Sequence, residues 1–309
     1  MLAVLAFIAA RVDWDRAVDR LETGRWELFG LAVCVLIAAL LLGAVRWRVL
    51  LWREPAIGTG QLAYAYSAGV FTNVFLPTSF GGDMARSWIL SRAAKVALPR
   101  VLASVVADRM LGFAAVFVVG WLVVATAPGE VPRSMLLALA WATIGAGVAL
   151  LIALLVTMDK RGRLRRVIPD RAQPPLRVFR DAFREYSRDR RVLIAAGALS
   201  VAYQALVVAE MWLLARAVGV EVPLAVLAAV LPLVLVATLL PLSIGGLGIR
   251  EGSIVLLLTQ TGVHTSDAAV ISLLSLAALT LATGMFALML IGKPIRDGLP
   301  RAGWSAPLQ

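Results

Sequence analysis

Two matching strings in this chain carry the residue types that could bind an anion. Residues 76–86 read LPTSFGGDMAR and residues 240–250 read LPLSIGGLGIR, so leucine, proline, serine, two glycines and an arginine recur in register. A helix that starts after the glycines presents free backbone N–H groups, which favour a negative charge. An arginine about one turn later can donate two parallel hydrogen bonds to phosphate oxygens. The strings therefore predict two anion-binding helix starts.

Each string also interrupts a long apolar run. Proline lacks a backbone donor and each glycine costs about 1 kcal/mol inside a helix, so neither string continues the helix before it. Matched interruptions in the two halves of an apolar chain indicate a transport site. Two ordinary turns at the membrane interface that happen to look alike are the simpler alternative.

The candidate binding residues come from the two strings and their surroundings. In the first half they are Asn73, Pro77, Ser79, Gly81, Gly82, Arg86 and Arg109. In the second half they are Pro241, Ser243, Gly245, Gly246, Gly248 and Arg250. Snorkelling of the string arginines to the membrane interface is the alternative to a binding role.

Four carboxylates could tune these arginines or couple binding to protons: Asp83, Asp108, Glu210 and Glu251. Asp83 and Glu251 stand at predicted helix starts, where N-capping is the simpler role. Asp108 lies within an apolar run, and Glu210 shares a helical face with Tyr203 in another. An ionisable residue in a spanning helix is costly unless it is paired or faces a cavity, although polar stripes also hold helices together.

The elements that must position these residues are membrane helices. The chain is 61% hydrophobic and 16% charged, whereas soluble domains are nearer 45–50% and 25%. Apolar runs that approach or exceed the roughly 18–20 residues needed to span a bilayer cover residues 28–45, 113–127, 135–158, 192–215 and 268–291. A transmembrane barrel would instead alternate apolar and polar residues. We therefore expect an all-α integral membrane protein, a polytopic helical bundle of about seven to nine membrane segments that forms a single domain over residues 1–309.

The positive charges indicate orientation rather than nucleic-acid binding. The net charge is +11, and residues 159–191 hold twelve Lys and Arg against five Asp and Glu. Such a loop is typical of the cytoplasmic side of a membrane and of contact with anionic lipid. Arg46, Arg48 and Arg53, which follow the first apolar run, and the basic C-terminus are then expected on the cytoplasmic side as well.

The orientation of the basic loop predicts an inverted repeat. With that loop inside, both ends of residues 54–97 lie inside and both ends of residues 222–262 lie outside, so each string becomes the elbow of a re-entrant hairpin. The predicted arrangement has a first repeat of about residues 26–127, a connecting helix 135–158, the basic cytoplasmic loop 159–191 and a second repeat of about residues 192–292. Residues 223–240 are also long enough to cross the membrane completely, which is the alternative.

The N-terminal region is expected to lie at the membrane surface. Its first ten residues, MLAVLAFIAA, are too short to span the membrane. We expect a first helix clipped short rather than a cleaved signal, because the stretch has no basic start and charge begins at once with Arg11. Residues 11–25 alternate charged and apolar side chains and predict an interfacial helix with Trp14 and Trp26 near the headgroups. Cys34 is the only cysteine, so no disulfide framework or thiolate metal site is expected.

Three stretches carry a resemblance to a known family. NVFLPTSFGGDMARSWIL, ASVVADRMLG and LLPLSIGGLGIREGSIVLLL resemble the lysylphosphatidylglycerol synthetase transmembrane (flippase-like) family of bacterial and archaeal membrane proteins, and the resemblance covers nearly the whole chain. The matching positions are Pro77, Gly81, Gly82, Arg86, Arg109, Pro241, Gly245, Gly246, Gly248, Arg250 and Glu251. Asp108 departs from the pattern, because a glutamate is commoner there.

The resemblance implies a transporter of lipids. The family is similar to the flippase half of enzymes that make and export aminoacylated phosphatidylglycerol, and other members are tied to polyprenyl-linked sugar pathways. We therefore expect a flippase of the cytoplasmic membrane that moves an anionic lipid, either a phospholipid or a polyprenyl-phosphate derivative. Because no aminoacyl-transferase domain follows before Gln309, we do not expect the synthetase activity of the family name.

Two other functions remain open at this point. One is a membrane enzyme or accessory factor in polyprenyl-phosphate-sugar or cell-envelope lipid synthesis, and the other is a non-catalytic scaffold. The sequence has no Asp-rich metal box, G-x-S-x-G string or P-loop. We therefore expect no enzymatic activity, no cofactor and no metal, and membrane lipids with anionic headgroups as the partners.

Overall fold

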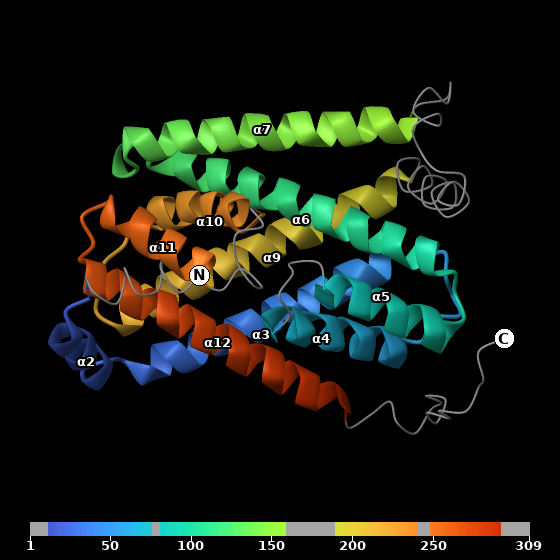
Figure 1. Ribbon diagram of the computed structural model, residues 1–309, viewed down its shortest axis with the longest axis horizontal. Coiled ribbons are helices and arrows are strands. Elements are labelled where there is room, and N and C mark those ends of the chain that lie inside the picture. The colour runs from blue at the N-terminus through green and yellow to red at the C-terminus, as the bar shows by residue number, and fades with distance from the viewer. Residues whose placement is uncertain (1–11, 76–80, 159–188, 240–247, 292–309) are drawn as a thin grey trace.

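The computed structural model describes residues 12–75, 81–158, 189–239 and 248–291, and the secondary structure there is entirely helical (Figure 1). Four helices are long and apolar enough to cross a membrane: α3 (Trp26–Leu50), α6 (Leu98–Thr126), α9 (Arg190–Ala217) and α12 (Thr265–Ile291). At about 1.5 Å per residue, each exceeds the roughly 30 Å of the hydrocarbon core. The predicted all-α class is confirmed.

Local sequence accounts for where two of these helices begin. Pro99 lies in the first turn of α6, where a missing N–H group breaks no hydrogen bond. Asp189 caps α9, because its side chain accepts a hydrogen bond from the backbone N–H of Val192. Both helices are rich in apolar residues on all faces, as expected for helices surrounded by protein and lipid.

The centre of the bundle is formed by α3 and α9, which make the most extensive helix–helix contact (Figure 1). On α9 and the neighbouring α10 (Leu224–Leu239), Met211, Leu214 and Leu227 are fully buried. Trp47 and Leu50 are fully buried on α3. Around this centre, α6 packs on α9 and α10, while α12 packs on α3. The interior is therefore formed by the long helices together with α10.

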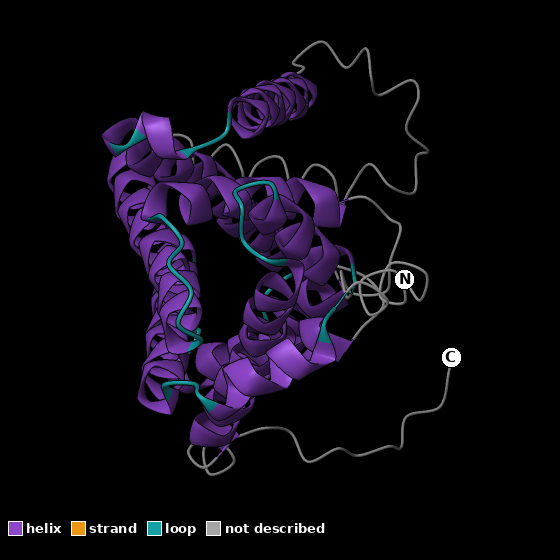
Figure 2. Ribbon diagram, turned by 90° about the vertical axis from the view of Figure 1, so that its left-hand side faces the viewer, coloured by secondary structure: helices purple, strands orange, loops and turns teal. Residues whose placement is uncertain are grey.

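The helix α7 (Arg133–Met158) lies on the outside of the bundle, apart from the other helices in Figure 2. Its first half packs inward through Met135 and Leu139, which are 1% and 0% exposed. From Trp141 onward its described side chains are exposed or half-buried. The second half of α7 therefore makes fewer contacts with the bundle, mainly through Ala142, Ala146 and a hydrogen bond from Trp121 of α6 to Thr143.

A pair of shorter helices flanks each matching string. α4 (Thr59–Phe75) and α5 (Gly81–Ala94) flank the first string, while α10 and α11 (Ile249–Thr259) flank the second, and the members of each pair pack together. A described helix therefore ends before each string, and the next begins within the first string at Gly81 and near the end of the second at Ile249. Six candidate residues lie outside the described residues: Pro77, Ser79, Pro241, Ser243, Gly245 and Gly246. The re-entrant orientation and the inverted repeat stay predictions.

The N-terminal helix α2 (Trp14–Glu22) is fastened to the start of α12 by a carboxylate. Arg16 and Arg20 both pair with Asp267, at 2.7 and 3.0 Å. The hydrogen bond with Asp267 raises the pKa of Arg16 above the usual arginine value, so this guanidinium stays charged. On the opposite side of α2, Trp14 and Val18 are 58% and 50% exposed. This two-sided helix fits the interfacial position predicted from its sequence.

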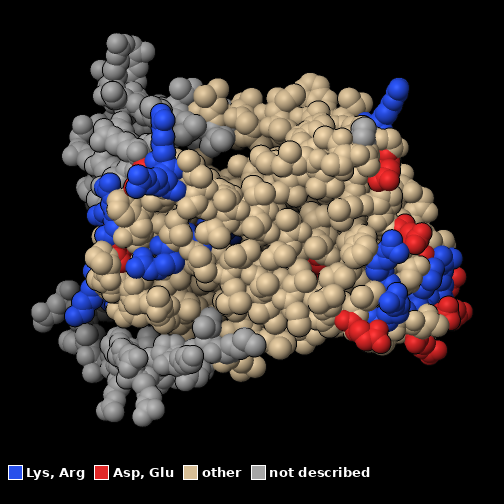
Figure 3. Space-filling view, turned by 180° about the vertical axis from the view of Figure 1, so that it is seen from behind, with Lys and Arg blue, Asp and Glu red and all other residues tan. Residues whose placement is uncertain are grey.

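Charged side chains gather at the two ends of the molecule. On the face drawn in Figure 3, the surface between these ends is nearly free of charge. The end near α2 carries both signs, and the opposite end carries mainly Lys and Arg among the residues drawn in colour. An apolar belt between two charged rims is the surface expected of a protein that crosses a bilayer.

The α4–α5 pair depends on a close backbone contact at Gly82. A Cβ atom at this position would overlap the carbonyl oxygen of Gly69 and the side chain of Asn73. We expect Gly82→Ala to destabilise the protein by roughly 1–3 kcal/mol, as overpacking does elsewhere, and to lower the midpoint of thermal unfolding in detergent. Gly145→Ala on α7 is the control, because nothing lies within 4 Å of its Cβ position. Equal midpoints for Gly82→Ala and the wild type would contradict the contact.

Candidate functional site

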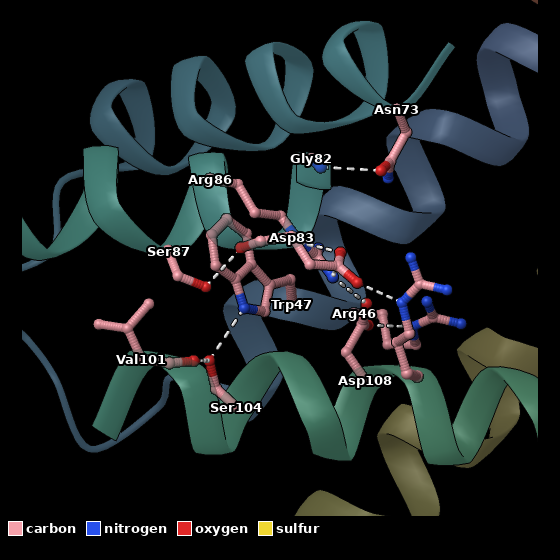
Figure 4. A network of polar contacts seen from close by, with 11 residues as sticks. Arg46, Trp47, Asn73, Gly82, Asp83, Arg86, Ser87, Val101, Ser104 and Asp108 are labelled. Atoms are coloured by element: carbon pink, nitrogen blue, oxygen red, sulfur yellow. Dashed lines mark hydrogen bonds and ion pairs between the residues drawn. The ribbon is translucent and has the colours of Figure 1, made fainter. Parts of the chain in front are cut away.

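Five charged side chains meet in the interior between α3, α5 and α6 (Figure 4). We call this group the arginine–aspartate cluster, and its members are Arg46, Asp83, Arg86, Asp108 and Arg109. Arg46 comes from α3, Asp83 and Arg86 come from α5, and Asp108 and Arg109 come from α6. The cluster thus joins the helix that follows the first string to two of the long helices.

Each aspartate of the cluster accepts hydrogen bonds from two arginines. Asp108 binds Arg46, with 2.5 Å between Oδ1 and Nε, and Arg86, with 3.1 Å between Oδ2 and Nη2. Asp83 binds Arg86 at 3.0 Å through Oδ1 and Arg109 through Oδ2. Arg86 therefore bridges the two carboxylates, and the five side chains form one continuous chain of ion pairs.

The cluster is buried and carries an excess of positive charge. Arg86 is 5% exposed and Asp108 is 3% exposed, whereas the side chain of Arg109 is 24% exposed. Among the described residues, three guanidinium groups face two carboxylates. Burying an ion costs several kcal/mol even in a relaxed protein interior, so buried guanidinium groups favour anionic partners. Arg109, the most exposed member, is the arginine that an incoming anion would meet first.

Aromatic rings and hydroxyl groups hold the guanidinium groups in place. The guanidinium of Arg86 lies over the rings of Trp47 and Tyr66, at 4.8 and 5.5 Å from their centroids. Arg46 lies 5.5 Å from the centroid of Tyr203 and also donates a hydrogen bond to Ser200 Oγ at 3.1 Å. Both arginines are thereby oriented before any ligand arrives.

Asn73 and Gly82, two predicted binding residues, bond to each other. The Gly82 N–H group donates to Asn73 Oδ1 at 2.9 Å (Figure 4). The space beside Gly82 is occupied by Gly69 and by Asn73 itself. These contacts give both residues a structural role between α4 and α5, and their role in binding stays a prediction.

At the second string, Gly248 and Glu251 shape the start of α11. Gly248 has a φ of 84°, a left-handed conformation that favours glycine. Its N–H group donates to Glu251 Oε2 at 2.6 Å. Glu251 is the third residue of the helix and accepts from the N-cap residue Gly248, the glutamate half of a capping box, so it acts at the helix start without being the N-cap itself. Asp83 differs, because its carboxylate binds the arginines of the cluster.

Arg250 and Glu210 meet through a serine of α12. Arg250 Nη2 donates to Ser275 Oγ at 2.8 Å, and the Ser275 hydroxyl donates to Glu210 Oε1 at 3.3 Å. Glu210 is 3% exposed and Ser275 is 1% exposed. We call these three residues the Arg250–Ser275–Glu210 relay.

The structure corrects the position expected for Arg46. The sequence places Arg46 at the cytoplasmic end of the first span, but α3 continues to Leu50 and Arg46 is only 7% exposed. The apolar residues that follow Arg46 were the available signal, because they extend the helix beyond it. Ser275 was missed altogether, since one serine in an apolar run gives no sign of its partners.

The arrangement offers arginine chemistry. No group of three or more His, Cys, Asp or Glu side chains suited to a metal ion occurs within the described ranges. The buried guanidinium groups can instead bind phosphate or carboxylate oxygens through paired hydrogen bonds. The geometry therefore supports recognition of an anion.

Comparison with known proteins identifies related sequences over most of the chain. Residues 1–287 match the family described as the lysylphosphatidylglycerol synthase TM region. A UPF0104 membrane protein of Methanothermobacter thermautotrophicus is 25% identical over 264 residues, which cover 77% of each chain. Another from the same organism is 26% identical over 249 residues, covering 72% of this chain and 71% of the relative. No solved structure matches the chain.

Asp108 is the member of the cluster whose loss should be most damaging. Asp108→Asn removes the negative charge that Arg46 and Arg86 share, and both arginines stay buried. Removing one partner of a buried ion pair costs roughly 3–5 kcal/mol of stability. We expect a clear fall in the midpoint of thermal unfolding in detergent. Asp15→Asn, at an exposed site on α2, is the control and should change stability by less than about 0.5 kcal/mol.

A double variant tests whether Arg46 and Asp108 stabilise the protein through their ion pair rather than each on its own. Arg46→Gln combined with Asp108→Asn removes both charges of one ion pair, so its loss of stability should be smaller than the sum of the two single losses. Additive losses would show that Arg46 and Asp108 contribute independently and would contradict the pairing.

Proposed function

The chain belongs to the lysylphosphatidylglycerol synthase TM-region family, and from this membership and its buried arginines we propose that it moves an anionic lipid between membrane leaflets. Its relatives are membrane proteins, and with four helices long enough to span, it is a multi-pass integral membrane protein. The observation that carries the proposal is the presence of the buried arginines Arg46 and Arg86, with Arg109 beside them, inside an apolar bundle.

A partly buried arginine lowers the main barrier to moving such a lipid. The acyl chains can stay in the membrane, whereas the phosphate of the headgroup is expensive to bring into hydrocarbon without a counter-charge. Arg109 offers that counter-charge, because its side chain is 24% exposed and its partner Asp83 is also held by Arg86. A phosphate that binds Arg109 can therefore replace part of an existing ion pair without stripping Asp83 of its other arginine.

Arg250 provides a second positive group associated with the second string. Its guanidinium is held by the neutral hydroxyl of Ser275, which leaves several donors for a ligand. The inverted repeat proposed from the sequence would direct the two strings toward opposite leaflets, so a headgroup could reach one arginine from each side. Phospholipids and polyprenyl phosphates both carry the required phosphate.

We place the protein in the cytoplasmic membrane, with residues 159–191 and the C-terminus on the cytoplasmic side. The support for this orientation is the concentration of basic residues in that loop. The turn between α5 and α6 then faces the cytoplasm, and the turn between α11 and α12 faces the other side. These two turns lie at opposite ends of the bundle (Figure 1).

Lipid movement can be measured in proteoliposomes with fluorescent phosphatidylglycerol and phosphatidylcholine in separate preparations. We expect the wild type to speed the exchange of phosphatidylglycerol between leaflets more than that of phosphatidylcholine. Arg109→Ala/Arg250→Ala should slow it by about tenfold or more, because a hydrogen bond to a charged group is worth about 1.5–3 kcal/mol. Arg216→Ala is the control, since its pair with Glu221 is exposed.

The same assay separates the rival functions. If neither phosphatidylglycerol nor a polyprenyl phosphate moves faster with the wild type than in empty liposomes, the flippase proposal is wrong. The accessory-enzyme or scaffold function would then be favoured. If the double variant moves lipid as fast as the wild type, the two arginines are not the headgroup site.

The orientation can be tested with single cysteines. Cys34→Ser removes the only native thiol, after which Ala97→Cys and His264→Cys place one reporter, in separate variants, at exposed sites in the two opposite turns. A membrane-impermeant maleimide should label position 264 in right-side-out vesicles and position 97 in inverted vesicles. Labelling of both positions in the same type of vesicle would contradict the proposed orientation.

A further inference from the structure

Glu210 differs from the other buried carboxylates of the described chain. Asp83, Asp108 and Asp267 each pair with two arginines, and Glu251 caps a helix. Glu210 is 3% exposed, and within the described residues its hydrogen-bond partner is the neutral hydroxyl of Ser275. No Arg or Lys of the described part lies within ion-pair distance of it. An ionised carboxylate in such a place is costly, whereas a protonated one is not.

The charged groups that act on Glu210 are few. From α11, Arg250 reaches it through Ser275 of α12. On α9 itself, Tyr203 lies two turns earlier and interacts electrostatically with both Glu210 and Arg250. The helix α10, which also packs on α9, contains no ionisable residue. Arg46 of α3 lies over the ring of Tyr203 and is paired with Asp108 of α6. Arg250 is therefore the cation that balances Glu210.

The relay can satisfy Glu210 in either protonation state. The Ser275 hydroxyl has one hydrogen and two lone pairs. When Glu210 is ionised, this hydrogen is donated to Oε1 while a lone pair accepts from Arg250. When Glu210 is protonated, its own O–H group can donate to the second lone pair of Ser275 Oγ, while the first still accepts from Arg250. The hydrogen bond between Glu210 and Ser275 is therefore kept in both protonation states, and only its donor and acceptor change places.

Binding of an anion at Arg250 changes this balance. The guanidinium then neutralises the ligand instead of Glu210, and the carboxylate is left buried without its balancing charge. Uptake of a proton by Glu210 removes that cost. By linkage, a proton on Glu210 must in turn strengthen binding of the anion at Arg250.

We propose that Glu210 is a proton-binding site that takes up one proton when an anionic headgroup binds Arg250. The inference rests on the proposed function, because the anion is the headgroup of the transported lipid. The headgroup and the proton enter together, so the loaded relay carries the same charge as the empty one. A proton gradient across the membrane therefore drives the lipid in the direction in which protons flow.

The test measures proton uptake without requiring transport. Dihexanoyl phosphatidylglycerol is added to wild-type protein in a weakly buffered detergent solution. Calorimetry measures lipid binding, and a pH-indicator dye measures proton uptake. We expect the wild type to take up close to a single proton per bound lipid, as the linkage requires. Glu210→Gln, which mimics the protonated side chain, should bind the lipid with uptake reduced at least severalfold. Glu221→Gln is the matched control, because its side chain is 83% exposed, and it should behave as the wild type does.

The outcomes separate the proton site from the proposed function. Binding without proton uptake in the wild type, or equal uptake in Glu210→Gln, overturns the proton site and leaves the flippase proposal standing. Failure of the wild type to bind the lipid contradicts the lipid proposal. In that case, infrared spectra recorded over a pH series still show whether Glu210 binds a proton. A protonated-carboxyl band that is present in the wild type and missing from Glu210→Gln supports the site, and a wild type without that band overturns it.

Discussion

The structure depends on the pairing of buried charge by Arg86. This one side chain binds Asp83 on its own helix and Asp108 on α6, and Asp108 in turn binds Arg46 on α3. In an apolar bundle each of these ions would be costly alone, so the helices are stable together only in the register that completes the pairs. The position of α5 relative to the two long helices is thereby fixed by electrostatics as well as by packing.

Close packing and charge act together at the first string. The contact between Gly69 and Gly82 lets α4 and α5 approach each other, and the hydrogen bond from Gly82 to Asn73 closes the end of that contact. Arg86 lies one turn further along α5, against Trp47 and Tyr66. The glycines therefore allow α4 and α5 to pack closely, and this packing places Arg86 in the interior.

The sequence predicted the class, the helix breaks and most charged members of the site, because these follow from local properties. Apolar length identifies spanning helices, and proline with paired glycines ends a helix whatever surrounds it. The partners of Arg46, Glu210 and Arg250 could not be predicted, because they come from other helices whose rotation is decided by packing. Arg46 shows the difference most plainly, since its place at the end of an apolar run suggested the membrane surface and its contacts place it inside. The orientation of the repeats depends on the membrane, which local sequence indicates only through its basic residues.

The exposed second half of α7 has a mechanical consequence. Buried contacts fix the first half of this helix through Met135 and Leu139, whereas from Trp141 onward most of its described side chains are exposed and would meet lipid in a membrane. A helix held at one end responds to bilayer thickness by tilting, because mismatch between its apolar length and the hydrocarbon core is relieved most cheaply in that way. The physical state of the surrounding lipids, rather than the protein core, therefore sets the angle at which this helix leads into the basic stretch that follows it in the chain.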